Sequence, residues 1–293
     1  MPAPGRAAYG KDIAGGFAAA VEKAIAGFKR DGMRPAALIC DSIFSSDGVF
    51  ADPPGFMAPA VAAIRAAGGL FIADEVQPGF GRTGDHFWGF GRHRLTPDIV
   101  TMGKPMGNGY PMAGRATRPA LLAAYCEDVG YFNTFGGNPA AAAAGLAVLD
   151  VIRDEGLREN ARSVGAYLRG RLAVLAQRCA GIGEVRGAGL FNAVEFCDDG
   201  DLARPDAETA TRVINGMRER GVLIGAAGRY GNILKIRPPL LLTVEKDAPW
   251  PEWVSMIAWP AIALALMALI LPRAKGVFIA IIWRTRAPGS EPT

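Results

Sequence analysis

Residues 70–114 read LFIADEVQPGFGRTGDHFWGFGRHRLTPDIVTMGKPMGNGYPMAG, and this stretch decides the fold. It contains two short apolar runs, 70–73 and 99–102, and each is followed by a reactive side chain: Asp74 after the first run and Lys104 after the second. Apolar runs of this length between turn residues are typical of buried strands in a parallel sheet. Because ligands of such sheets bind beyond the carboxyl ends of the strands, we expect Asp74 and Lys104 to face one crevice.

An acid and a lysine at one crevice suit a cofactor that carries an aldehyde. The amine of Lys104 can form a Schiff base with the aldehyde, and Asp74 can keep a ring nitrogen protonated. The bland alternatives are that the lysine is merely solvated and that the acid caps a turn. Lys104 lies between Gly103 and Pro105, directly after an apolar run, which favours the catalytic interpretation. Burial and neighbouring positive groups can lower the pKa of such a lysine and free its amine.

Four sequence blocks resemble the class III pyridoxal-phosphate-dependent aminotransferases, in that family's order and spacing. They are DEVQPGFGRTG (74–84), PDIVTMGKPMGNGYPMAG (97–114), YFNTFGGNPAAAAAGLAVLDVI (131–152) and GNILKIRPPL (231–240). The similarity covers residues 36–243 and is greatest to the alanine–glyoxylate aminotransferase 2-like branch, which also contains phospholyases acting on phosphoethanolamine-type substrates. It implies the α/β fold of the fold-type I pyridoxal-phosphate enzymes, with a mostly parallel sheet, flanking helices and a small C-terminal α+β domain.

The resemblance assigns roles around pyridoxal 5′-phosphate (PLP) to four residues within the stretch 70–114. Lys104 is the residue that holds the cofactor and then moves the substrate proton, and Asp74 is the partner of the pyridine nitrogen. Val76 presses on the ring face, and Gln77 approaches the ring hydroxyl oxygen. Amino acids and 2-oxo acids are the substrates that this family implies.

Two further site residues are implied by the later blocks. Thr134 contacts the cofactor phosphate of a neighbouring subunit, which implies a homodimer with a shared active site; the alternative is a plain capping loop with Asn138 as the helix cap. Arg237 clamps the substrate α-carboxylate, since a guanidinium fork matches a carboxylate, and the alternative is a surface arginine.

The sequence predicts three regions: 1–180 as a partial large PLP-binding domain, 181–250 as a small C-terminal domain, and 251–293 as an apolar tail. The family carries a longer N-terminal portion, with a Gly-Ser/Thr-Glu-Ala phosphate loop and an aromatic residue that stacks on the ring. Neither occurs before Asp74. We therefore expect the large domain to be incomplete at its N-terminus, with unpaired strand edges and exposed apolar area.

The tail holds WVSMIAWPAIALALMALILP at 253–272, twenty residues without a charge. This run is long enough to span a bilayer. A membrane anchor, a rearranged reading frame and a buried core helix all fit it. A cytoplasmic location is expected for the chain, with membrane association through the tail as the addition that an anchor would bring.

Composition narrows the remaining function classes. The 293 residues carry a formal net charge of +4 with scattered arginines, which predicts no nucleic-acid partner. Four well-separated cysteines indicate reduced thiols. The two histidines have no other potential metal ligands at a suitable spacing, so we expect no metal site. The predicted function is transfer of an amino group between an amino acid or amine and a 2-oxo acid. Two alternatives stay open: a phospho-lyase of the same branch, and a catalytically silent, membrane-associated fragment.

Apolar spacing and turn residues predict the remaining elements, with residues 1–16 as a loop. The expected helices cover 17–30, 54–67, 120–127, 140–154, 157–178 and 208–220. The expected strands cover 36–40, 221–226 and 233–239, with more strand within 181–196.

Overall fold

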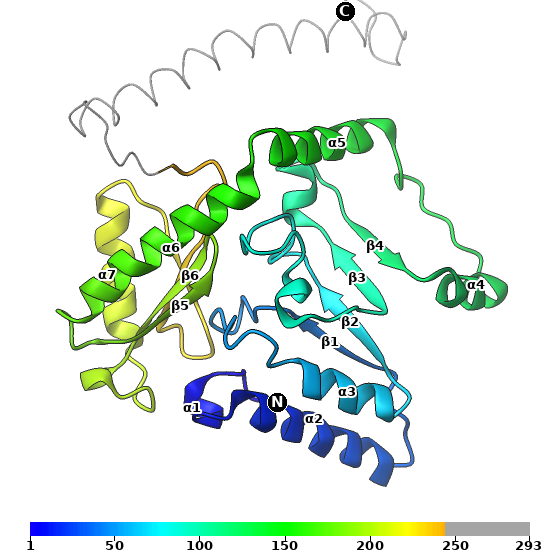
Figure 1. Ribbon diagram of the computed structural model, residues 1–293, viewed down its shortest axis with the longest axis horizontal. Helices are drawn as coiled ribbons and strands as arrows, with labels where there is room; N and C mark the ends of the chain where they lie inside the picture. The colour runs from blue at the N-terminus through cyan, green and yellow to red at the C-terminus, as the bar shows by residue number, and fades with distance from the viewer. Residues whose placement is uncertain (244–293) are drawn as a thin grey trace, which may run out of the picture. The chain divides into compact units, whose positions relative to one another are not determined.

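The computed structural model describes residues 1–243, which are built on two four-stranded sheets (Figure 1). The predicted tail 251–293, with its candidate membrane span 253–272, lies outside the described residues. Within residues 1–243, no helix combines the length and apolarity needed to cross a bilayer.

The first sheet carries the ends of the apolar runs. Its strands are β1 (Ala37–Asp41), β2 (Leu70–Asp74), β3 (Ile99–Met102) and β4 (Gly114–Thr117), in that spatial order. β1, β2 and β3 run parallel, and β4 is antiparallel to β3. The expected mostly parallel sheet is therefore confirmed. β4 was not predicted, because its four residues, GRAT, contain neither an apolar run nor a clear alternation.

Two helices cover one face of this sheet and build the main core. α2 (Ile13–Arg30) packs against α3 (Ala58–Ala66), and α3 contacts β1 and β2. Phe17 and Phe71 are buried in the cluster that joins them. The prediction of a loop over 1–16 is wrong: α1 (Arg6–Tyr9) is helical, and α2 begins at residue 13 because the Asp12 side chain accepts from the Gly15 N–H.

The chain then leaves the first sheet through less buried segments. α4 (Pro119–Asp128) has no buried residue, and an extended loop leads from it to α5 (Pro139–Asp154) and α6 (Leu157–Ala176), as Figure 1 shows. Three short 3-10 turns complete the described helices: η1 (Gly89–His93), η2 (Lys104–Gly107) and η3 (Asp198–Gly200).

The second sheet is antiparallel and has the order β5 (Ile182–Ala188), β6 (Phe191–Phe196), β8 (Ile233–Ile236) and β7 (Gly225–Ala227). α6 and α7 (Ala207–Glu219) pack on it. The strand expected over 221–226 is shorter than predicted, because Gly221 has a φ of 81° and turns the chain at the end of α7. The division into domains at residue 180 stays a prediction.

The exposed apolar side chains of the described unit include two groups that bear on the expectations from the sequence. β1 is an edge strand that pairs only with β2, and the side chain of Ile39 is 60% exposed. In the loop between α4 and α5, Phe132 is 86% and Phe135 is 80% exposed. Both surfaces match the exposed apolar area expected from the sequence.

Replacement of Phe71 by Ala is expected to destabilise the fold strongly. The ring is fully buried between the sheet and the helices, so truncation should lower the free energy of unfolding by about 3–5 kcal/mol. Phe28→Ala is the matched control, since Phe28 is 44% exposed and should change it by about 0.5 kcal/mol or less. Urea unfolding of the full chain measures both; equal losses in the two variants would contradict the assigned core.

Candidate active site

The parallel register brings two acids together at the carboxyl ends of the strands of the first sheet. Asp41 pairs with Asp74 across β1 and β2, and Asp74 pairs with Thr101 across β2 and β3. Asp74 Oδ1 accepts from the Val76 N–H at 3.0 Å and from Thr101 Oγ1 at 3.5 Å. Among the hydrogen bonds of residues 1–243, none ends on Asp74 Oδ2, which leaves one oxygen of a half-buried carboxylate available to a ligand.

Lys104 follows the next strand and begins η2. Its side chain is exposed on the described unit. Its φ is 37°, in the left-handed region that a side chain disfavours, and such backbone costs on the order of 1–3 kcal/mol and gathers at functional sites. Gly103 lies against Val76, since a Cβ at Gly103 would be 3.7 Å from the valine side chain. The segments after β2 and β3 are thus neighbours.

Gln77 connects these strand ends to the second sheet. Its Oε1 accepts from Lys235 Nζ at 2.9 Å and from Arg237 Nη1 at 3.0 Å. Its amide nitrogen donates to Ser46 Oγ at 3.1 Å, in the loop after β1. The structure therefore brings the predicted residues Gln77 and Arg237 together, through a contact that the sequence did not indicate.

Lys235 is a site residue that the sequence reasoning missed. Lys235 and Arg237 are two residues apart along β8 and its extension, and alternate residues of a strand face the same side. Both cations also lie over the Phe191 ring, at 5.4 Å and 5.9 Å from its centroid. The period-2 spacing in ILKIR was the available signal.

The charges of these groups act on one another. Burial lowers the pKa of Lys235, and the positive charges of Arg237 and Lys104 lower it further, while Asp41 opposes them. Burial raises the pKa of Asp41, and Asp74 adds to that rise against hydrogen bonds from Ser45 and Ile43. The amine of Lys104, the two carboxylates and the β8 cations therefore share one electrostatic environment.

Thr134 lies apart from this group. It sits in the exposed loop between α4 and α5, and within residues 1–243 no hydrogen bond joins it to Asp74, Gln77 or Lys104. Asn138 caps α5 by accepting from the Ala141 N–H at 2.9 Å, as the capping alternative expected. The role of Thr134 toward a neighbouring subunit stays a prediction.

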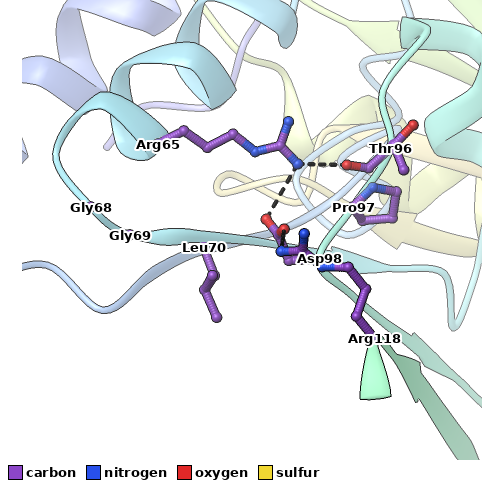
Figure 2. Close-up of a pocket in the computed structure, with 8 residues that line it drawn as sticks. All are labelled: Arg65, Gly68, Gly69, Leu70, Thr96, Pro97, Asp98 and Arg118. Carbon is purple, nitrogen blue, oxygen red and sulfur yellow. Dashed lines mark hydrogen bonds and ion pairs between the residues drawn. The ribbon is translucent and has the colours of Figure 1, made fainter. Parts of the chain in front are cut away.

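A cavity of about 540 Å³ lies at the opposite, amino ends of the strands, where β2 and β3 begin. Figure 2 shows Asp98 facing Arg65 there; Arg65 donates to Asp98 Oδ2 at 3.2 Å, and Arg118 donates to Oδ1 at 2.6 Å. Burial raises the pKa of Asp98, but the Phe71 N–H and the two arginines outweigh it and hold the pKa below its usual value. Both oxygens of the Asp98 carboxylate accept hydrogen bonds from arginines. We therefore interpret the polar groups that line this cavity as a structural ion-pair cluster.

The comparisons with known proteins agree with the fold. Residues 8–257 match the family model described as aminotransferase class III, and residues 233–283 match a second model, a protein of unknown function. The mitochondrial alanine–glyoxylate aminotransferase 2 homolog 2 of Arabidopsis thaliana is 46% identical over 72% of this chain. A phospholyase from Arthrobacter, solved with phosphoethanolamine, is 42% identical over 80% of this chain, with a TM-score of 0.76. A PLP-bound amine transaminase from an uncultivated Pseudomonas species is 32% identical over 79%, with a TM-score of 0.71.

The chain belongs to the class III aminotransferase family. The expected fold-type I architecture and the resemblance to the alanine–glyoxylate aminotransferase 2-like branch are confirmed. The chain spans about half the length of its relatives, 44% of the Arabidopsis protein and 55% of the Arthrobacter chain. A cytoplasmic location stays a prediction.

Substitution of Arg237 by Ala is expected to raise the pKa of Lys235. The guanidinium shares the Gln77 oxygen with the lysine and is the largest charge that lowers its pKa, so removing it favours the protonated amine. A nuclear magnetic resonance titration of the lysine side chains measures the change. Arg229→Ala, in the nearby loop, is the control and should leave Lys235 as it was; an unchanged or lower pKa in Arg237→Ala would contradict the coupling.

Proposed function

We propose that this chain carries the active-site core of a PLP-dependent transaminase that moves an amino group between an amino acid or amine and a 2-oxo acid. The observation that carries the proposal is the arrangement at the carboxyl ends of β2 and β3. There a Lys104 amine and an Asp74 oxygen that has no hydrogen-bond partner within residues 1–243 follow neighbouring strands, and Gln77 links these strand ends to the cations of β8.

The chemistry of these residues fits PLP. Lys104 offers a primary amine for an aldehyde, Asp74 offers a free carboxylate oxygen for a ring N–H, and Val76 lies beside Gly103 at the turn that presents the lysine. When bound, PLP supplies an aldehyde for covalent attachment and an electron-withdrawing ring. Thr134 of a second copy is the proposed contact for the phosphate.

The residues of this chain would then divide the work. Lys104 holds the cofactor and, once released from it, carries a proton to and from the substrate Cα. Asp74 holds the proton on the ring nitrogen, because a carboxylate beside a pyridinium favours the charged form. Arg237, with Lys235 beside it, binds the substrate carboxylate and orients the Cα–H bond.

Borohydride reduction in the presence of PLP tests the lysine. The full chain should gain a PLP absorbance band that reduction fixes covalently, and peptide mass spectrometry should locate the label at Lys104. Lys104→Ala should abolish the label, and Lys11→Ala, which removes an exposed lysine in the N-terminal region, should keep it. A wild-type chain that takes up no PLP supports the catalytically silent fragment and contradicts the proposal.

A phospho-lyase activity is the second candidate. It is favoured by the similarity to the Arthrobacter phospholyase and by the second cation, Lys235, beside Arg237. Two cations on one acceptor suit a substrate with a doubly charged phosphate. Release of inorganic phosphate from phosphoethanolamine, without a 2-oxo acid acceptor, would support the lyase; conversion of alanine with glyoxylate supports the transaminase.

A homodimer with a shared site is the proposed assembly, and a mixing experiment tests it. The exposed Phe132 and Phe135 beside Thr134 suit burial against a second copy. Lys104→Ala chains and Thr134→Val chains should each retain PLP poorly. When the two variants are unfolded together and refolded, each mixed dimer has one site with an intact lysine and an intact threonine. The mixture should therefore bind PLP more tightly than either variant alone and give more label at Lys104. No gain on mixing would mean that Thr134 does not serve a neighbour's site.

A further inference from the structure

A buried carboxylate lies directly behind the proposed cofactor face. The side chain of Glu75, the residue after Asp74, is fully buried. Its Oε1 accepts from Ser42 Oγ at 2.9 Å and from the Phe90 N–H at 2.8 Å, and its Oε2 accepts from the Gly89 N–H at 2.7 Å. Three donors converge on two oxygens, which is the environment of an ionised carboxylate rather than of a protonated acid.

The packing around this carboxylate is close. A Cβ at Gly89 would collide with Ser42 Oγ, so only glycine lets the η1 turn approach. Ser42 is itself fixed: its carbonyl oxygen lies 2.7 Å from His93 Nε2, and His93 Nδ1 accepts from the Gly55 N–H at 3.1 Å. His93 is therefore the tautomer that carries its proton on Nε2 and donates it to Ser42. A buried polar chain thus runs from residue 55 to Glu75.

Two side-chain hydrogen bonds fasten the loop after β1 to the segment after β2. Ser42 donates to Glu75 at the buried end, and Gln77 donates to Ser46 at the crevice end. Asp74 directly precedes Glu75 in the sequence, and Gln77 follows two residues after it. Any movement of residue 75 is therefore transmitted to the proposed partner of the ring nitrogen and to the acceptor that Lys235 and Arg237 share.

We propose that Glu75 is a positioning residue that holds Asp74 and Gln77 in their cofactor-facing arrangement, by tying residues 75–77 to Ser42 and to the backbone of Gly89 and Phe90. It touches neither cofactor nor substrate and acts through its neighbours. The choice of PLP binding as one readout rests on the proposed function; the contacts of Glu75 do not.

The carboxyl of Glu75 titrates in a measurable range. Burial raises its pKa to about 7, and the charge of Asp41 adds to that rise, while the three hydrogen bonds oppose it. His93, the other titratable group of the cluster, has a pKa lowered to about 4 by burial and stays neutral in this range. Protonation of Glu75 removes the charge from the acceptor and so weakens its hydrogen bonds from the Gly89 and Phe90 N–H groups.

Acidification should change global stability and local hydrogen bonding in opposite directions, so an experiment can tell the two effects apart. Because the pKa of Glu75 is higher in the folded chain than in the unfolded one, its contribution to global stability increases as the pH falls from about 7 toward 4.5. Over the same range the local bonds to Gly89 and Phe90 weaken. Residues 75–77 and 89–90 should thus loosen while the whole chain becomes no easier to unfold.

The test follows amide hydrogen exchange and PLP affinity in the full chain between pH 5.5 and 8.5. In wild type, exchange protection at Val76, Gly89 and Phe90 should fall with a midpoint near 7 on acidification, and PLP affinity should fall about five- to tenfold with the same midpoint. Glu75→Gln should show low protection and weak PLP binding at every pH, without a midpoint, because its NH₂ group faces backbone donors.

Two further variants make the test specific. Ser42→Ala removes one of the hydrogen bonds that lower the pKa of Glu75, so it should move the midpoint to higher pH without abolishing it. Asp98→Asn removes a buried carboxylate at the opposite edge of the same sheet and should leave the midpoint unchanged, whatever it does to unfolding. A role for Glu75 in stability alone would leave PLP affinity and the exchange of the Val76 N–H without a midpoint in wild type and in both variants.

The outcomes distinguish this inference from the proposed function. If wild type binds PLP without a midpoint and Glu75→Gln binds it equally well, the positioning role is wrong while the transaminase proposal stands. If wild type binds no PLP, the transaminase proposal fails. The exchange midpoint, and its shift in Ser42→Ala, then decide the role of Glu75 by themselves.

Discussion

The parallel pairing of β1, β2 and β3 is the constraint on which the site depends. Parallel pairing makes all three strands end at one edge, so the register that sets Asp41 beside Asp74 and Asp74 beside Thr101 also sets the turn that carries Lys104 beside them. The buried rings of Phe17 and Phe71 belong to the apolar cluster that joins α2 and α3 to this sheet. Without that register, the acid and the amine would be distant loop residues.

Gln77 gives the second sheet its part in the site. One amide oxygen accepts from two cations, and the same amide donates to the loop after β1. Neutral acceptors do not cancel the charge of Lys235 and Arg237, so both remain able to bind an anionic substrate group. Burial and, after it, the repulsion from Arg237 lower the pKa of Lys235. Gln77, which the resemblance assigns to the ring hydroxyl, therefore also connects the two sheets through its hydrogen bonds.

The strand ends combine exposed and buried polar groups in a useful order. Lys104 and one Asp74 oxygen are open, whereas Glu75, between Asp74 and Val76, has its carboxylate enclosed by donors. A loop that must present reactive groups to a ligand cannot bury them, and it gains rigidity from the layer beneath instead. The opposite edge follows another logic: Asp98 is neutralised by two arginines and offers no free oxygen.

The sequence by itself determined the family, the parallel strands and most helices, and it predicted Asp74 and Lys104 as the two reactive residues. It could do so because apolar runs and glycine-flanked turns are local signals, and the blocks around them are dense. It missed β4, whose pairing depends on the neighbouring β3, and α1, whose four residues carry no periodicity. Only the tertiary structure decided that Lys235 shares Gln77 with Arg237 and that Glu75 meets Ser42 and the η1 turn. Those contacts join residues 14–160 positions apart, and no local pattern encodes which distant donor will face a given acceptor.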